Sequence, residues 1–76
     1  MEAHIKTLIA KLFDVDETYL SLNSSPDEIE KWDSLGHMNI VAAIEEEFEI
    51  ELSDDEIDAM ANIASIINIV EGKISW

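Results

Sequence analysis

Apolar residues recur at helical spacing in the first part of the chain. Between positions 5 and 13 they are separated by three, one, three and one residues: Ile5, Leu8, Ile9, Leu12 and Phe13. Such a pattern is typical of one face of an amphipathic α-helix. We therefore expect a first helix here, with this face in the core of the protein.

The helical pattern breaks between residues 14 and 33. A structureless connection of this length is rare inside a compact domain, so we expect local structure within it. Ser25 as an N-cap, followed by Pro26 and by Glu28 in a capping box, predicts one or two helical turns that end near Glu30. Apolar residues are expected to attach the connection to the core: Val15, Leu20, Leu22, Ile29 and Trp32.

A second long helix is predicted from Ser34 to about Phe48, with Asp33 as its N-cap. The inward positions have helical spacing, with Ile40 beside them: Met38, Val41, Ile44 and Phe48. A second stripe is expected to face outward, with Glu45 at its flank: Leu35, Asn39, Ala42, Glu46 and Glu49. This helix is therefore expected to be apolar inside and acidic outside.

Two further helices are predicted in the remainder of the chain. Ser53 and Glu56 form a capping box that opens a short helix, roughly Asp54 to Met60, with Ile57 and Met60 directed inward.

Asn62 is expected to cap the last helix, whose apolar positions have helical spacing: Ile63, Ile66, Ile67 and Val70. Gly72 is expected to end this helix in a left-handed cap, and Lys73 suits the negative end of the helix dipole. We expect the terminal Trp76 to be loosely held.

These elements predict an all-α fold, a small four-helix bundle formed by one domain over residues 1–76. It has three longer helices, a short third helix and a long loop between the first and second helices. Asn-Gly and Asp-Gly pairs, which favour β-hairpins, do not occur in the chain. Amphipathic helices of this length bury their apolar faces by packing around a shared core.

The balance of charge narrows the class of partner. The chain has 18 acidic residues, 4 lysines and no arginine, for a net charge of −14. Such a protein repels nucleic acid and anionic membranes and attracts basic partners. We therefore expect no nucleic-acid partner and no membrane insertion, and the charged outward face predicts a monomer.

The absence of cysteine excludes disulfides, thiolate zinc sites and cysteine nucleophiles. It also fits a reducing compartment. The first residues do not have the layout of a signal peptide, and the longest apolar run is too short to span a bilayer. These features predict a cytoplasmic protein.

An enzymatic role is disfavoured by the titratable residues. His37 lies one helical turn after Ser34, but a hydrolytic triad also needs a group that orients the base, in a site that excludes water. We expect His37 and His4 to be solvated surface residues, and their separation does not match a metal site. The sequence thus predicts no catalytic residue and no metal ligand.

Ten of the acidic residues lie between Asp33 and Asp58, where lysine and arginine do not occur. A solvated face is the simplest interpretation of such a run. A docking surface for basic proteins explains it better, because the repulsion between the acids costs stability. The same repulsion predicts raised pKa values for the clustered carboxylates.

Ser34 is the residue on which a functional interpretation depends. Small polar residues are common at helix starts, so its presence alone indicates little. A helix N-terminus, however, offers unpaired N–H groups and a positive dipole end, both of which stabilise a phosphoryl group. Gly36 is expected to leave room for its close approach.

Three further stretches give the sequence its family resemblance. These are Asp33-Ser34-Leu35, the helix end Ile44-Glu45-Glu46-Glu47-Phe48, and the following Ile50-Glu51-Leu52-Ser53-Asp54-Asp55-Glu56. Together with length, acidity and helix order, they make the chain similar to the acyl carrier protein family. The three-residue motif alone is weakly specific, whereas the combination is strongly specific.

The resemblance implies that Ser34, beside the helix cap Asp33, carries 4′-phosphopantetheine, which a phosphopantetheinyl transferase adds from coenzyme A. Acyl groups are then bound to the arm as thioesters, and enzymes with basic docking patches load and unload them. The resemblance also implies partner-binding residues on the second helix and its start: Asp33, Leu35, Ala42, Glu45 and Glu46. We expect Asn39 and Glu49, which share the outward stripe, to belong to the same surface. Met38, Ile57 and Met60 are expected to line a pocket for the acyl chain.

Some residues differ from those common in carriers of fatty acid synthesis. Lys31 stands where many of those carriers have glycine, Trp32 follows it, and Gly36 and Asn39 replace acids common after the motif. In these positions the chain resembles specialised carriers, which serve polysaccharide, secondary-metabolite or aminoacyl chemistry. One alternative is therefore an aminoacyl or peptidyl carrier. The other is an acidic interaction module without a prosthetic group.

Overall fold

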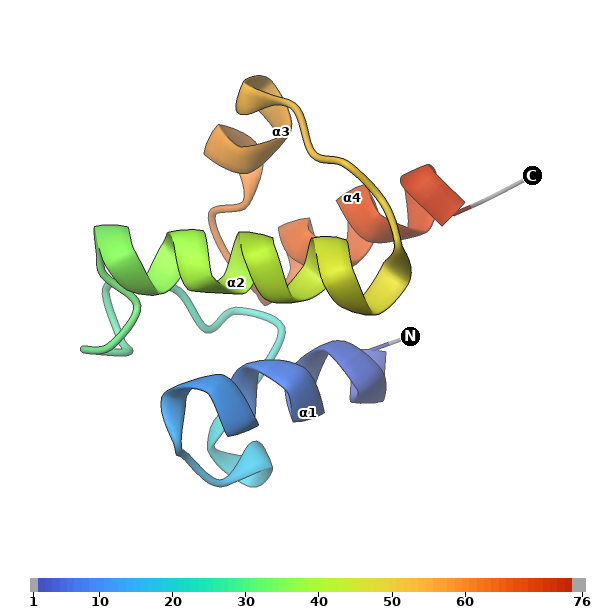
Figure 1. Ribbon diagram of the computed structural model, residues 1–76. Coiled ribbons are helices and arrows are strands. Elements are labelled where there is room, and N and C mark those ends of the chain that lie inside the picture. Colours follow the sequence, from blue (N-terminus) through green and yellow to red (C-terminus); the bar gives the residue numbers. More distant parts are fainter. Residues whose placement is uncertain (1, 75–76) are drawn as a thin grey trace.

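The computed structural model describes residues 2–74, and its helices form a bundle (Figure 1). The helices are α1 (Glu2–Phe13), α2 (Ser34–Phe48), α3 (Asp54–Ala59) and α4 (Ile63–Ile74), with a 3₁₀ turn, η1 (Glu17–Tyr19), after α1. The described residues contain no strand. The predicted fold class is therefore confirmed, whereas the prediction for Trp76 lies outside the described residues.

The three longer helices build the core, and α3 covers one end of it. α1 packs against α2 and α4, and α3 packs against α4. In Figure 1, α1 runs antiparallel to α2, and α1 and α3 lie on opposite sides of α2. None of the residues within α3 is fully buried, so apolar burial holds this helix less than the others. The longer helices contribute most of the buried apolar residues: Ile5, Ile9, Phe13, Ile40, Val41, Ile44, Ile63, Ile66, Ile67 and Val70.

Two predicted inward residues are exposed instead. Met38 is 51% exposed and Leu12 is 38% exposed. In α2 the buried face is centred on Ile44, with Ile40 and Val41 beside it. Met38 lies six residues before Ile44, which is roughly 120° around the helix. The predicted stripe is therefore confirmed at Ile40, Val41 and Ile44, and Phe48 packs against the core, whereas the prediction for Met38 is wrong.

The connection between α1 and α2 is ordered by local polar contacts. Asp16 caps η1, because its carboxylate accepts a hydrogen bond from the N–H of Thr18. Ser25 accepts one from the N–H of Ile29, so the predicted helical segment is one hydrogen-bonded turn and not a helix. Ile29 and two other predicted anchors are buried: Leu20 and Trp32. Leu22 was predicted to join them but is 41% exposed.

The connection is also tied to the start of α4. The N–H of Ile63 donates to the carbonyl of Ser24, and the N–H of Ala64 donates to the carbonyl of Leu22. The side chain of Asn62 accepts from the next N–H, as its predicted capping role requires. Leu22 therefore holds the connection in place through its backbone and not through its side chain.

The end of α4 differs from the prediction at Gly72. No glycine among the described residues has a positive φ, so Gly72 does not form a left-handed cap. The helix continues through it to Ile74. Glycine permits a left-handed cap but does not impose one.

None of the helices in residues 2–74 is long and apolar enough to cross a membrane.

Candidate functional site

Ser34 lies at the first position of α2, and its side chain is exposed. Asp33 caps the helix, because its Oδ1 accepts a 2.8 Å hydrogen bond from the N–H of Gly36. The carbonyl of Asp33 accepts a 2.7 Å bond from the N–H of His37. The predicted cap is therefore confirmed, and it presents an accessible hydroxyl at a helix start.

The first turn of α2 fits a phosphate ester on that hydroxyl. In the part of the chain that the structure describes, the N–H groups of Ser34 and Leu35 have no hydrogen-bond partner. At the start of α4, by contrast, every N–H of the first turn is bonded. Free N–H groups at the positive end of a helix dipole stabilise an adjacent anion.

Gly36 packs against the protein's own backbone. A Cβ atom at this position would lie 2.0 Å from the carbonyl oxygen of Lys31 and 3.2 Å from the ring of Phe13. The absence of a side chain therefore lets α2 approach the segment before it. The expectation that Gly36 makes room for a phosphate is replaced by this role in packing.

His37 is not the solvated residue that we predicted, because both of its ring nitrogens are hydrogen-bonded. Its Nδ1 lies 2.9 Å from Nε1 of Trp32, and its Nε2 lies 2.9 Å from the carbonyl oxygen of Ile57. An indole N–H only donates, so Nδ1 accepts and Nε2 carries the proton given to Ile57. The two rings are nearly parallel, with an interplanar angle of 14° and centroids 6.2 Å apart.

A shallow, open groove of about 600 Å³ lies beside Ser34. Residues from the connection, the start of α2 and the end of α3 line it: Pro26, Trp32, Asp33, Ser34, His37, Met38, Ile57 and Asp58. The groove therefore combines apolar surface with two carboxylates and an imidazole.

The three residues predicted to line an acyl pocket are divided between two environments. Met38 and Ile57 line the groove. Met60 does not, because it is 1% exposed and belongs to the core. The sequence could not reveal this division, since Ile57 and Met60 are both apolar and lie one turn apart.

The outward face of α2 largely agrees with the prediction. Leu35 is 72% exposed, and four further members of the predicted stripe are also exposed: Asn39, Ala42, Glu46 and Glu49. Glu49 follows the helix as its C-cap, with a left-handed φ of 54°. This face therefore offers apolar and acidic groups to solvent.

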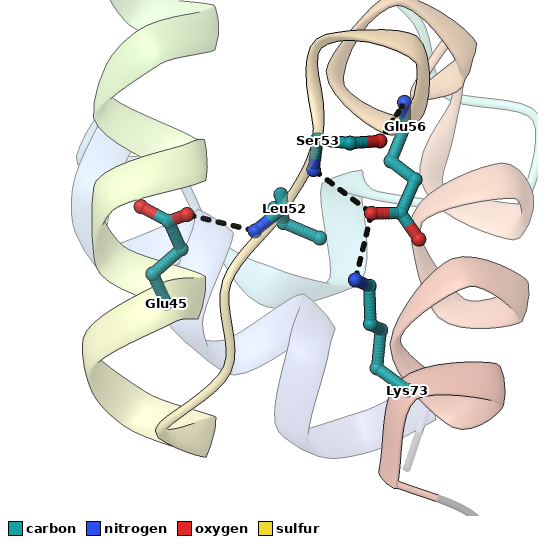
Figure 2. Close-up of polar contacts among 5 residues, drawn as sticks. All are labelled: Glu45, Leu52, Ser53, Glu56 and Lys73. Atoms are coloured by element: carbon teal, nitrogen blue, oxygen red, sulfur yellow. Dashed lines mark hydrogen bonds and ion pairs between the residues drawn. The ribbon is translucent and has the colours of Figure 1, made fainter.

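Glu45 differs from its neighbours on that face. It is half-buried, and its Oε2 accepts a 2.9 Å hydrogen bond from the N–H of Leu52 (Figure 2). Leu52 is buried in the core. Glu45 therefore fixes the connection between α2 and α3, a role that its position in an acidic run did not indicate.

Glu56 joins α3 to α4 (Figure 2). It completes the predicted capping box with Ser53, and its Oε1 lies 2.8 Å from Nζ of Lys73. The ammonium of Lys73, followed by the N–H of Ser53, lowers the pKa of this carboxyl below its usual value. For Glu56 the predicted upward shift is therefore wrong, because Lys73 is distant in sequence but adjacent in space.

Replacing Glu56 by glutamine is expected to lower the Tm at neutral pH, by an amount that shrinks as the pH falls. The folded-state pKa lies below the unfolded one, so the ionised carboxylate stabilises the fold above the unfolded pKa. That contribution disappears as the pH falls through the folded pKa. Thermal melts of both proteins between neutral pH and about pH 3 measure the effect.

Asp55→Asn is the matched control for this prediction, because Asp55 is an exposed acid in the same turn. We expect it to change the Tm little. A Tm difference between the parent protein and Glu56→Gln that stays constant down to the lowest pH contradicts the prediction.

Residues 2–74 contain no cluster of three or more histidine, cysteine, aspartate or glutamate side chains suited to a metal ion. His4 is exposed, as predicted, and its Nε2 lies 2.8 Å from a carboxylate oxygen of Glu47.

Sequence reasoning missed three contributors to the site: Pro26, His37 and Asp58. Pro26 was assigned to a helix start, and Asp58 was counted only as one acid among many. For His37 the one available signal was Trp32 nearby, a buried donor that requires an acceptor. The contact with Ile57 had no sequence signal, because 20 residues separate the partners.

Comparison with known proteins gives a family-model match over residues 3–70, described as a phosphopantetheine attachment site. Two similar curated relatives are acyl carrier proteins. That of Clostridium acetobutylicum is 30% identical, covering 88% of this chain and 87% of the relative. That of a Sulfurovum species is 37% identical, covering 76% of this chain and 91% of the relative.

Among solved structures, the fold is similar to a solution NMR structure of holo acyl carrier protein from Geobacter metallireducens. The TM-score is 0.88 at 26% sequence identity, and the match covers 97% of this chain and 85% of the other.

Proposed function

This chain belongs to the acyl carrier protein family, and on that premise we propose that Ser34 is the attachment site of its 4′-phosphopantetheine arm. The protein carries acyl groups on this covalently attached arm. The observation that supports Ser34 is its exposed hydroxyl at the start of α2, beside two free N–H groups and an open groove.

In the attachment step this chain supplies only the serine hydroxyl and its surroundings. The Ser34 oxygen forms a bond to the phosphorus of coenzyme A that bears pantetheine. The phosphoanhydride bond breaks, the adenosine bisphosphate leaves with that electron pair, and the serine proton passes to the transferase or solvent. The chain keeps the hydroxyl accessible through the Asp33 cap, and the helix start stabilises the phosphodiester anion.

A carrier without catalytic activity of its own is the role we propose. In the described part of the chain, both ring nitrogens of His37 are already hydrogen-bonded, to Trp32 and Ile57. An imidazole acts as a general base only through a free ring nitrogen within reach of the hydroxyl it activates. His37 offers no such nitrogen to Ser34, and this supports modification by another enzyme.

The partners of this family are a phosphopantetheinyl transferase and biosynthetic enzymes that use the acyl groups. We propose that they dock on the outward face of α2 through basic patches, with Leu35 as a central apolar contact. Its exposure and the charge of −14 support this proposal. The other proposed contacts are Asp33, Asn39, Ala42, Glu46 and Glu49. Glu45 is left out, because its carboxylate holds Leu52.

The strong negative charge also supports a monomer, since two copies repel each other. The cysteine-free composition supports a location in the reducing cytoplasm.

Replacing Ser34 by alanine is expected to abolish attachment of the arm. Incubation with coenzyme A, Mg²⁺ and a broad-specificity phosphopantetheinyl transferase should add one phosphopantetheine to the parent protein, as intact mass spectrometry measures. Ser34→Ala should gain no mass, because the attacking oxygen is gone. Ser21→Ala, which removes another exposed hydroxyl, should be modified like the parent.

Two outcomes oppose the proposal. An unmodified parent protein favours an acidic interaction module without a prosthetic group. A mass gain that persists in Ser34→Ala places the arm on another residue.

A further inference from the structure

The imidazole of His37 bridges the segment before α2 and the helix α3. It accepts from the indole N–H of Trp32 and donates to the carbonyl of Ile57, each over 2.9 Å. Trp32 is 1% exposed, so one end of the bridge is anchored in the core. The other end holds a backbone carbonyl within α3, and this bridge therefore fixes the position of that helix.

α3 depends on polar contacts of this kind, because it has six residues and none is fully buried. Its first turn is held by the capping box of Ser53 and Glu56 and by the ion pair with Lys73 (Figure 2). Its second turn is held by His37. The buried C-cap residue Met60 also anchors this end of α3, so loss of the His37 bridge weakens, at the border of the groove, the attachment of α3 to α2.

The bridge also lies between two environments. On one side is the open groove, lined by Ser34, His37 and Ile57. On the other side is the core: the carbonyl of Ile57 also accepts from the N–H of Met60, whose side chain is 1% exposed. An acyl chain that reached this core from an arm on Ser34 would have to separate α3 from the start of α2. The bond between His37 and Ile57 opposes that separation.

We propose that His37 is a latch that keeps the acyl chain in the groove and out of the core. The proposal rests on the attachment of the arm to Ser34. In the groove the chain meets a mainly apolar lining that includes Met38 and Ile57, but the groove is open, so one side of the chain stays in water. A long saturated chain therefore gains only part of the apolar burial that the core would give, whereas a short acyl group with a hydroxyl or amino substituent keeps its hydration. The carrier is therefore suited to short, polar acyl groups.

The test compares acyl forms of the intact protein. The transferase attaches acetyl, 3-hydroxybutyryl and octanoyl pantetheine arms from the corresponding coenzyme A thioesters, and intact mass confirms each product. The proteins are the parent, His37→Ala, His37→Gln and the control His4→Ala. The readouts are the rate of thioester cleavage by hydroxylamine, which reports access to solvent, and the Tm.

In the parent protein we expect the three thioesters to be cleaved at similar rates, and octanoylation to leave the Tm unchanged. In His37→Ala the octanoyl thioester should be cleaved several-fold more slowly than the acetyl one. Its Tm should also rise above that of the acetyl form, because a chain bound in the core stabilises the folded state. His4→Ala should behave like the parent.

The variant His37→Gln distinguishes loss of the two hydrogen bonds of the latch from a general loss of stability. A glutamine amide can accept from Trp32 and donate to Ile57, so this variant should restore the parent's cleavage rates. Where His37→Ala fails to fold, Trp32→Phe provides the same comparison, because it removes the N–H that anchors the latch while keeping an aromatic ring.

Slow cleavage and a raised Tm for octanoyl in the parent protein overturn the latch, since the core then accepts the chain with His37 in place. Equal cleavage rates for all acyl groups in a folded variant that lacks the latch overturn it as well. A parent protein that gains no mass at all instead overturns attachment at Ser34, and the latch with it.

Discussion

Replacement of Trp32 by alanine is expected to lower the free energy of unfolding by about 3–5 kcal/mol, the range for large aromatic residues in protein cores. Trp32 is 1% exposed, its ring contacts Phe13, and its N–H anchors His37. A chain of 76 residues has a total stability of about 4–11 kcal/mol. The variant should therefore be near its unfolding threshold, as urea denaturation followed by circular dichroism measures.

Tyr19→Ala is the control for this prediction, because Tyr19 is an aromatic residue that is 68% exposed. Its loss should change the stability by less than about 0.5 kcal/mol. If Trp32→Ala lowered the free energy of unfolding no more than Tyr19→Ala does, the buried position of the indole would be in error.

Replacement of Gly36 by alanine is expected to destabilise the protein, although alanine is the better helix former. The added Cβ would lie 2.0 Å from the carbonyl oxygen of Lys31, a backbone atom that cannot rotate away. Such overpacking costs about 1–3 kcal/mol or more, whereas helix propensity returns at most about 1 kcal/mol. The net effect should lower the Tm by several degrees, since each kcal/mol shifts it by about 4–8 °C in a domain of this size.

Gly72→Ala provides a control of opposite sign. Gly72 is also helical, and nothing lies within 4 Å of a Cβ placed there. The propensity gain is therefore unopposed, and the Tm should rise. A Gly36→Ala protein that melts at or above the parent's Tm would show that the backbone of Lys31 moves at little cost.

The features that could be predicted from the sequence are those fixed by neighbours along the chain. The caps at Asp33, Ser53 and Asn62 depend on groups within three residues, and all three occur as predicted. The exposed hydroxyl of Ser34 followed from the Asp33 cap. Hydrophobic spacing likewise predicted the number and order of the helices.

The features that could not be predicted depend on contacts across the fold. His37 reaches Ile57 over 20 residues, and Glu56 pairs with Lys73 in another helix. Met38 is exposed because tertiary packing decides which of two adjacent apolar faces of α2 is buried. In each case spacing restricts what a residue can do locally, and the partner that decides its role lies in another element.

The backbone bonds between the first connection and α4 also affect exchange with solvent. First-turn amides of a helix normally exchange quickly, because no carbonyl of the same helix covers them. The amides of Ile63 and Ala64 are instead covered by the carbonyls of Ser24 and Leu22. Their hydrogen–deuterium exchange is therefore controlled by undocking of the connection, and not by fraying of α4. These two amides thus report whether the segment leading to Ser34 is docked.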